Sequence, residues 1–297
     1  MNQEERIRCQ FGKRKDTFNK SAQWMENKEL INAHLELAGK PKKDQGHCLD
    51  VCCGTGIMGT AFKRHGWNVK GIDLTPEFLE IASQNIETTL GNVEKMPYKN
   101  NSFNIAIIRQ SYKLINGPNV LKEISRILKP KGKFILGQSI SFSEKDEVLY
   151  RKIQEARHIN MMCYYTHDEF IKELEQNAFS VLTYKQVVVR ESVDHWLKYA
   201  LSLSDEQKLE IKNFILLAPQ EYKEIHEVEL IGDELFENWN WHIYLCENQK
   251  KLMFIDRASR RIPLTIAVSR IVSKPLSRFT KSVSSANPSS VAVDGKV

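Results

Sequence analysis

Residues 48–59 read CLDVCCGTGIMG, a short apolar run followed by glycines in the spacing G-x-G-x-x-G. The run predicts a buried strand, and the residues that follow, as far as His65, have the pattern of a helix. A strand, a glycine-rich turn and a helix N-terminus together form a cradle for a nucleotide-containing cofactor. Asp73 ends a second predicted strand, residues 68–73, about 20 residues after the first glycine, where a carboxylate can hold ribose hydroxyls.

The alternation of strand and helix continues along the chain. Further strands are predicted at residues 88–90, 103–108, 133–136, 181–189 and 241–246, and helices at residues 21–38, 120–128 and 167–176. Another helix opens at Pro76, with Thr75 as its N-cap. This alternation predicts an α/β fold with a doubly wound, Rossmann-like sheet that is mostly parallel.

We expect the chain to divide into three segments. Residues 1–45 form an N-terminal helical cap, residues 46–250 the main domain, and residues 251–297 a basic, serine-rich tail. Within the main domain, residues 192–237 look helical and are too long for a plain connection, so we interpret them as a lid over the acceptor. Its apolar side chains include Trp196, Tyr199, Phe214 and Tyr222.

The positive charge of the chain is concentrated in the tail. The net charge is +6, yet residues 257–297 alone carry eight cations and one anion, so the rest of the chain is close to neutral. A neutral body argues against nucleic acid as a partner. Serines and prolines predict that the tail is weakly ordered. Residues 262–283, which mix apolar with basic residues, also fit contact with a membrane surface or a protein.

Cysteine usage and hydropathy bear on the compartment. The six cysteines form no C-x-x-C pair, and no apolar run reaches the roughly 18 to 20 residues that span a bilayer. The chain opens without an apolar signal core. These features predict a cytoplasmic protein with free thiols and no metal site.

The glycine motif alone does not select a cofactor, but Asp50 does. It lies within the first strand, four residues before Gly54. A carboxylate there is unfavourable beside a pyrophosphate and favourable beside an ammonium and a sulfonium. This favours S-adenosyl-L-methionine over NAD, and an NAD-dependent oxidoreductase stays a remote alternative because no Tyr-x-x-x-Lys set is evident.

Four stretches resemble, in order, the motifs of class I S-adenosylmethionine-dependent methyltransferases, especially the ubiquinone and menaquinone C-methyltransferases of the methyltransferase type 11 group. They are LDVCCGTG (49–56), GID ending at residue 73, GNVEKMP (91–97) and EISRILKPKG (123–132). The resemblance runs from about residue 18 to residue 247. It implies an antiparallel last strand. It also implies a cofactor site made of Asp50, Cys53, Gly54, Thr55, Gly56, Asp73, Leu74, Asn92, Val93 and Arg109.

The acceptor side departs from that family. RQSYKLI (109–115) stands where a frequent R-Q-x-L-H-H-I pattern carries two histidines. Methyl transfer from a sulfonium mainly requires positioning of the nucleophile and needs no metal. We expect Tyr112 or His158 to accept or guide a proton. Other candidates at the rim are Gln110, Ser111, Tyr164 and Tyr165.

The resemblance predicts an enzyme that methylates a small-molecule acceptor. The near-neutral body favours such an acceptor over RNA. An RNA methyltransferase and a catalytically silent, cofactor-binding partner protein remain alternatives, because a fold does not establish a function. The sequence gives no prediction of the oligomeric state.

Overall fold

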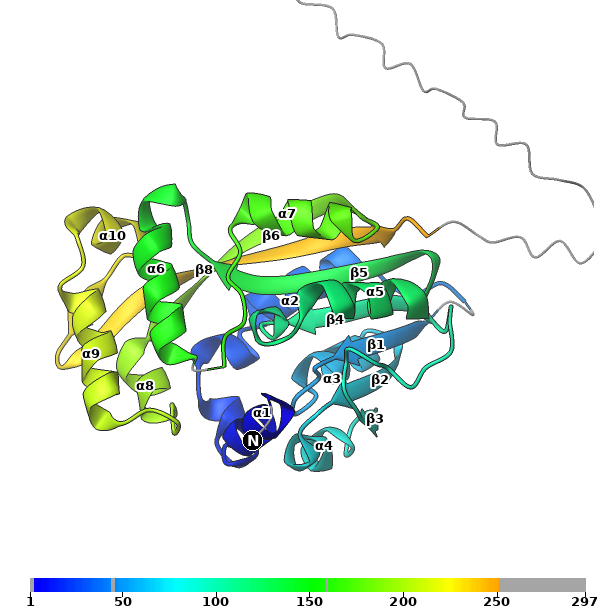
Figure 1. Cartoon of the computed structure of the whole chain (residues 1–297), viewed down its shortest axis with the longest axis horizontal. Helices are drawn as coiled ribbons and strands as arrows, with labels where there is room; N and C mark the ends of the chain where they lie inside the picture. Colours follow the sequence, from blue (N-terminus) through cyan, green and yellow to red (C-terminus); the bar gives the residue numbers. More distant parts are fainter. Residues whose placement is uncertain (1–2, 44–45, 159, 251–297) are drawn as a thin grey trace, which may run out of the picture. The chain divides into compact units, whose positions relative to one another are not determined.

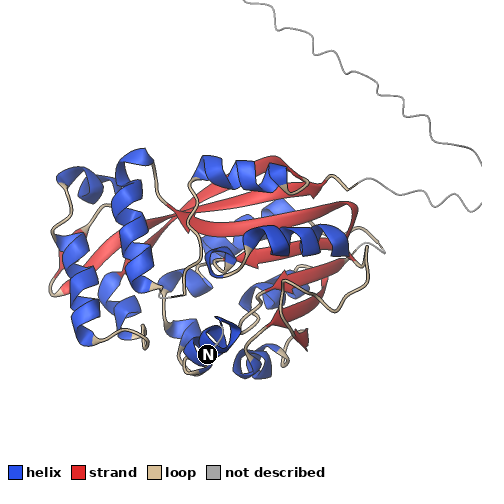
Figure 2. Ribbon diagram, in the orientation of Figure 1, coloured by secondary structure: helices blue, strands red, loops and turns tan. Residues whose placement is uncertain are grey.

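The computed structural model describes residues 3–43, 46–158 and 160–250. Its centre is a sheet in the order β3-β2-β1-β4-β5-β8-β6, with β7 paired to β8 (Figures 1 and 2). The strands are β1 (His47–Val51), β2 (Asn68–Asp73), β3 (Glu87–Leu90), β4 (Phe103–Arg109), β5 (Leu128–Ile140), β6 (Phe179–Ser192), β7 (Glu229–Ile231) and β8 (Glu234–Asn248). Strands β1 to β5 pair in parallel, and β8 runs antiparallel to β5 and β6. The predicted fold class is thus confirmed.

Helices cover both faces of the sheet. They are α1 (Gln3–Gly12), α2 (Lys28–Ala38), α3 (Ile57–Arg64), α4 (Pro76–Ala82), α5 (Gly117–Ile127), α6 (Glu144–Arg157), α7 (His167–Gln176), α8 (Val193–Lys198), α9 (Asp205–Leu216) and α10 (Gln220–Ile225). Short 3-10 turns are η1 (Phe18–Lys20), η2 (Gln23–Glu26) and η3 (Tyr112–Leu114). One apolar core includes residues of α2 and α3 and the other residues of α5 and α7, so the central strands are buried on both sides.

Local sequence signals explain several helix boundaries. Helix α7 occupies residues 167–176, as predicted, because Thr166 and Glu169 form a capping box at its start. Helix α4 begins at Pro76, as predicted, but the Thr75 side chain makes no cap hydrogen bond. The helix predicted at residues 21–38 begins only at Lys28, where the Asn27 side chain accepts from the Leu30 N–H at 2.8 Å. The turn η2 precedes it, and α1 has no counterpart among the predicted helices.

Residues 192–237 contain α8, α9, α10 and β7, and the helical prediction fails from Glu229 on, where β7 and the start of β8 pair. Strand β6 pairs with β8 from the Phe179–Asn248 pair to the Ser192–Phe236 pair, along the whole of β6. The helices therefore gather around α6, at the end of the sheet remote from β3 (Figure 1).

Two further predictions from the sequence concern membrane crossing and the C-terminal tail. No helix within the described ranges combines the length and apolar character that a membrane crossing requires. The predicted basic tail, residues 251–297, lies outside the described residues.

Candidate active site

Two adjoining pockets lie at the carboxyl ends of β1, β2 and β4. Strand β1 is the switch point of the sheet, because the chain builds outward from it to β2 and β3 on one side and to β4 and β5 on the other. Ligands of doubly wound folds bind at this place. The larger pocket has a volume of about 320 Å³ and the smaller one about 100 Å³. Their shared lining is Phe11, Phe18, Cys52, Gly54, Ser111 and Leu114.

The glycine-rich turn between β1 and α3 requires its glycines. Gly54 and Gly56 have φ values of +53° and +82°, in the left-handed region that side chains disfavour. At Gly59, a Cβ would lie 2.7 Å from Ile86 and 3.0 Å from the Asp50 carboxylate. Gly54 lines both pockets and Thr55 the smaller one, whereas Gly56 lines neither and only shapes the turn.

Asp50 places a buried carboxylate on the smaller pocket. Its Oδ2 accepts from the Gly59 N–H at 2.7 Å, which fixes the side chain beneath the turn. Burial raises the pKa of Asp50 to about 7, although the Gly59 hydrogen bond and the Arg109 charge act in the opposite direction. A cation bound beside Asp50 would stabilise the charged form, as the sequence argument requires.

Asp73 holds the edge of the larger pocket. Its Oδ2 accepts from the Gly54 N–H at 2.8 Å and its Oδ1 from the Thr75 N–H at 2.9 Å. One carboxylate therefore connects the glycine turn to the start of α4. Each oxygen retains acceptor capacity, because a carboxylate offers about four lone-pair sites. Burial raises the pKa of Asp73.

The expected adenine segment begins beside Asp73, whose carbonyl accepts from the Gly91 N–H at 3.0 Å. Leu74, Asn92 and Val93 all line this pocket. The Asn92 Oδ1 accepts from the Glu94 N–H at 2.7 Å, and its Nδ2 donates to the Glu4 carboxylate. The amide is thus fixed in the orientation that leaves its oxygen as an acceptor.

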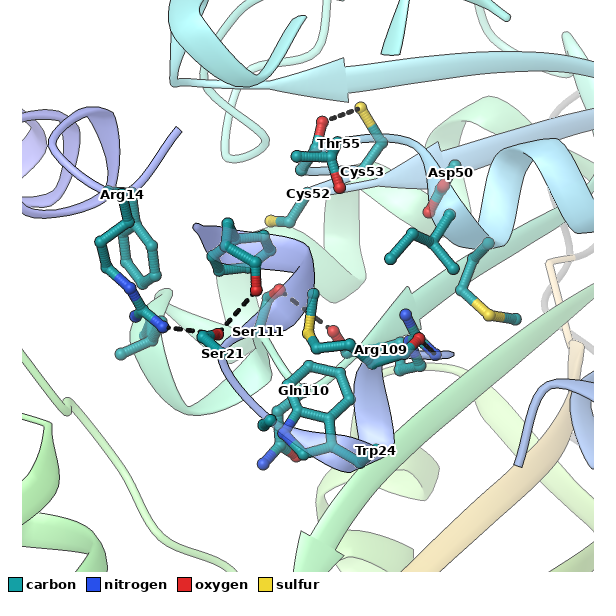
Figure 3. Close-up of a pocket in the computed structure, with 18 of the residues that line it drawn as sticks. Arg14, Ser21, Trp24, Asp50, Cys52, Cys53, Thr55, Arg109, Gln110 and Ser111 are labelled. Atoms are coloured by element: carbon teal, nitrogen blue, oxygen red, sulfur yellow. Dashed lines mark hydrogen bonds between the residues drawn. The ribbon is translucent and has the colours of Figure 1, made fainter. Parts of the chain in front are cut away.

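Cys53 and Arg109, two of the expected cofactor residues, are held by contacts with neighbouring elements. Cys53 lines the smaller pocket and packs on β2, where a Cβ at Gly71 would lie 2.7 Å from its sulfur. Burial raises the pKa of its thiol well above the usual value, which fits packing rather than reactivity. Arg109 also lines this pocket, donates to the Met25 carbonyl at 3.1 Å and lies over the Trp24 ring, 5.1 Å from its centroid (Figure 3).

The stretch that contains Asp50, Asp73 and Arg109 is similar to known proteins. The model of a family described as a methyltransferase domain matches residues 49–136. This part of the chain resembles a methyltransferase domain. This confirms the resemblance inferred from the sequence, and the ten expected cofactor residues all lie within the matched range.

Two curated relatives of this methyltransferase domain act on different molecules. The chain is 28% identical over 145 residues to a sterol 4-C-methyltransferase of Caenorhabditis elegans, covering 45% of this chain and 43% of the relative. It is 32% identical over 133 residues to a demethylmenaquinone methyltransferase of Bacillus licheniformis, covering 40% and 55%. The chain thus spans about half the length of these relatives.

Solved structures agree on the fold. A putative methyltransferase from Bacillus halodurans superposes with a TM-score of 0.66 at 21% identity, over 74% of this chain and 99% of that one. The YcgJ protein from Bacillus subtilis gives a TM-score of 0.65 at 16% identity, over 74% and 98%. At these identities the likeness concerns the fold alone.

Tyr112 does not face either pocket, which corrects the expectation that it guides a proton. It begins η3 after the methyltransferase domain's fourth strand, and its ring is fully buried against Tyr165 and Phe170. Its hydroxyl donates to the Glu173 carboxylate at 3.3 Å. The ring turns into the core because the α7 side offers aromatic partners, so Tyr112 is a packing residue.

His158, the other expected proton acceptor, does line the smaller pocket. Its Nε2 is buried and has no hydrogen-bond partner. Burial, with the nearby charges of Lys113 and Arg157, holds its pKa well below the usual value, so the imidazole is neutral. A neutral ring with an unpartnered nitrogen can take part in a hydrogen bond, but the burial and positive neighbours that lower its pKa oppose its uptake of a proton.

The remaining rim candidates divide in the same way. Ser111 and Gln110 line the smaller pocket, but the Gln110 amide is held by Ser139, to whose hydroxyl it donates at 2.7 Å. Tyr164 and Tyr165 line neither of the two pockets. The Tyr164 hydroxyl accepts from the Ser141 N–H at 2.9 Å, and Tyr165 packs on Phe170.

The expected lid is also corrected. None of the described residues that line either pocket comes from residues 192–237. Trp196 is buried against Trp239, and Tyr222 is buried and donates to Glu237 at 3.1 Å. The apolar side chains that suggested a cover instead form the insertion's own core with α6 and β8.

The N-terminal segment, residues 3–27, covers the pockets instead. Phe11 and Phe18 pack with Phe78 of α4, with ring centroids 4.4 to 6.1 Å apart. The Glu191 carboxylate of β6 fixes the other end by accepting from the Trp24 N–H at 2.6 Å and the Gln23 N–H at 3.0 Å. Sequence reasoning predicted a helical cap but identified none of these residues, because no motif marks them.

Proposed function

We propose that this chain binds S-adenosylmethionine and transfers its methyl group to a small-molecule acceptor. The observation that carries the proposal is the placement of Asp50 and Asp73 on adjoining pockets at the ends of β1 and β2. One carboxylate suits the ammonium of the cofactor's amino-acid end, and the other suits its ribose hydroxyls.

The larger pocket suits the adenosine portion of the cofactor. Its volume of about 320 Å³ is within the range of small-molecule sites. Asp73 would accept from the ribose hydroxyls, and the Asn92 amide oxygen would accept from the adenine amino group. Leu74 and Val93 would supply apolar contact to the base.

The smaller pocket suits the methionine end and the reacting part of the acceptor. The bound cofactor supplies a methyl group on a positively charged sulfur, whose departure as a neutral thioether makes the displacement favourable. The chain would contribute orientation, because the glycine turn, Ser111 and Arg109 all line this pocket and would contact the ligand. The neutral His158 would hydrogen-bond the acceptor and so guide the group that loses a proton.

The described thiols fit a reducing compartment, and we place the reaction in the cytoplasm on that ground. All six cysteines lie within described ranges and are free, three of them buried. Free thiols persist where disulfides are kept reduced.

The binding test uses calorimetry of the intact chain with S-adenosylhomocysteine and with NAD. We expect the first to bind and the second to give no heat, because Asp50 opposes a pyrophosphate. Tight binding of NAD without binding of S-adenosylhomocysteine would overturn the proposal. Incorporation of labelled methyl groups from S-adenosylmethionine into an extract of small metabolites then tests the transfer itself.

A further inference from the structure

Three guanidinium groups converge on the smaller pocket. Arg109 ends β4, Arg14 lies between α1 and η1, and Arg157 ends α6 (Figure 3 shows the first two). Asp50 is the single carboxylate among the described residues that line this pocket. None of the three arginines forms an ion pair with any residue that the structure describes.

The surroundings of Arg157 and Arg14 leave part of each side chain without a partner. The Arg157 guanidinium packs between the rings of Trp196 and Trp239, 4.4 Å from each centroid, and its Nη1 is buried without a hydrogen bond. The Arg14 Nη2 donates to the Ser21 hydroxyl at 2.9 Å, while its buried Nε has no partner. Burial lowers the pKa of both to about 10, so both remain charged at neutral pH.

Taking a charge out of water is costly. Glu191 and Glu237 attract the Arg157 guanidinium, and Asp50 attracts that of Arg109, without forming ion pairs. The unpartnered N–H groups of Arg14 and Arg157 can be satisfied by a ligand. The carboxylate of a bound cofactor would pair with one of the three arginines. Arg109 is the suitable one, because it belongs to the methyltransferase domain and lies beside Asp50, which would face the neighbouring ammonium. The other two belong to elements outside the domain match, the N-terminal segment and α6.

We propose that the acceptor carries an oxyanion, a carboxylate or a phosphate, which Arg14 and Arg157 bind in the smaller pocket. This inference rests on the proposed function. Planar guanidinium groups match both oxyanions through paired hydrogen bonds, and the indole rings hold Arg157 in position. The anion brings the acceptor's reacting atom near His158, the chain neighbour of Arg157.

The experiment measures binding of three probes that share a phenyl ring to the chain saturated with S-adenosylhomocysteine. Benzoate and phenyl phosphate carry the anion, and benzamide is the neutral control. We expect at least one anion to bind at least about tenfold more tightly than benzamide, as hydrogen bonds to charged groups require. Which of the two binds more tightly identifies carboxylate or phosphate as the source.

Variants assign that preference to the two arginines. Arg157→Gln and Arg14→Gln should each weaken anion binding about tenfold and leave affinity for S-adenosylhomocysteine within about threefold. Arg157→Lys should recover part of the loss. Arg64→Gln, which removes an exposed arginine of α3, is the matched control and should change neither affinity.

Each outcome bears on one claim. Equal binding of benzamide and the anions, no binding of either anion, or unchanged anion binding in both glutamine variants would overturn the proposal. Parallel loss of anion and S-adenosylhomocysteine binding would also overturn it, because the arginines would then serve the cofactor. Failure of the unaltered chain to bind S-adenosylhomocysteine would instead refute the proposed function. If Arg157→Gln does not fold, as judged by circular dichroism, the Arg14→Gln result decides.

Discussion

Replacing Asp73 by Asn separates its role in the ligand site from its role in the fold. The carboxylate accepts from the Gly54 and Thr75 N–H groups at 2.8 and 2.9 Å. An asparagine side chain has one oxygen, so it can keep only one of these contacts well and presents N–H donors where ribose hydroxyls would donate. The change is therefore small in volume and large in hydrogen-bonding character.

The expected loss can be estimated from these contacts. A hydrogen bond to a charged group contributes about 1.5 to 3 kcal/mol. Burial of the charged carboxylate is unfavourable and raises the pKa of Asp73, so a neutral amide at this position avoids that cost and offsets part of the lost binding energy. We expect S-adenosylhomocysteine to bind less tightly by about 1 to 3 kcal/mol, a factor of about 5 to 160. The free energy of unfolding should fall by about 1 to 2 kcal/mol, because one buried N–H loses its acceptor.

Calorimetry and urea denaturation measure the two effects separately. Asp205→Asn is the matched control, because the Asp205 side chain is 97% exposed and lies on α9, away from both pockets. It should leave ligand affinity unchanged. An Asp73→Asn variant that binds S-adenosylhomocysteine within twofold of the unaltered chain would refute the assignment of Asp73 to the ribose.

Three further predictions address Asp50, Tyr112 and the insertion. Affinity for S-adenosylhomocysteine should fall as pH drops below about 7, because Asp50, whose pKa is raised to about 7, must lose its proton to face the ammonium. Calorimetry of Asp50→Asn should show a weaker dependence of affinity on pH, and an unchanged dependence would contradict the role of Asp50. Tyr112→Phe should retain methyl transfer, since its hydroxyl meets Glu173 and no pocket; a loss above tenfold would restore its catalytic role. Trp196→Ala should destabilise the chain by about 3 to 5 kcal/mol in denaturant titrations while the folded fraction binds ligand normally; weakened binding would support a lid.

The sequence was most informative for residues whose positions follow from local spacing. The strand, the glycine turn and the helix occur within one short stretch, so Asp50 and the glycines could be placed before any tertiary structure was known. Asp73 followed from the regular interval between two parallel strands. The positions of these residues are determined by short stretches of local chain and not by packing between distant segments.

It was less informative where side-chain direction or distant packing decides. Tyr112 follows the correct strand, but aromatic partners on α7 turn its ring into the core. Arg14 and Arg157 reach the same pocket from segments more than a hundred residues apart, and no periodicity joins them. The insertion was interpreted as a lid from its length and its apolar side chains. The pairing of β8 with the whole of β6 carries it away from the pockets, and composition does not reveal that pairing.

The most direct test of the account is a crystal structure of the chain with S-adenosylhomocysteine. The account predicts ribose hydroxyls within hydrogen-bond distance of the Asp73 carboxylate, adenine beside Val93, and the ligand's ammonium facing Asp50. A ligand whose ribose lies away from Asp73, or whose amino-acid end points away from Asp50, would contradict it.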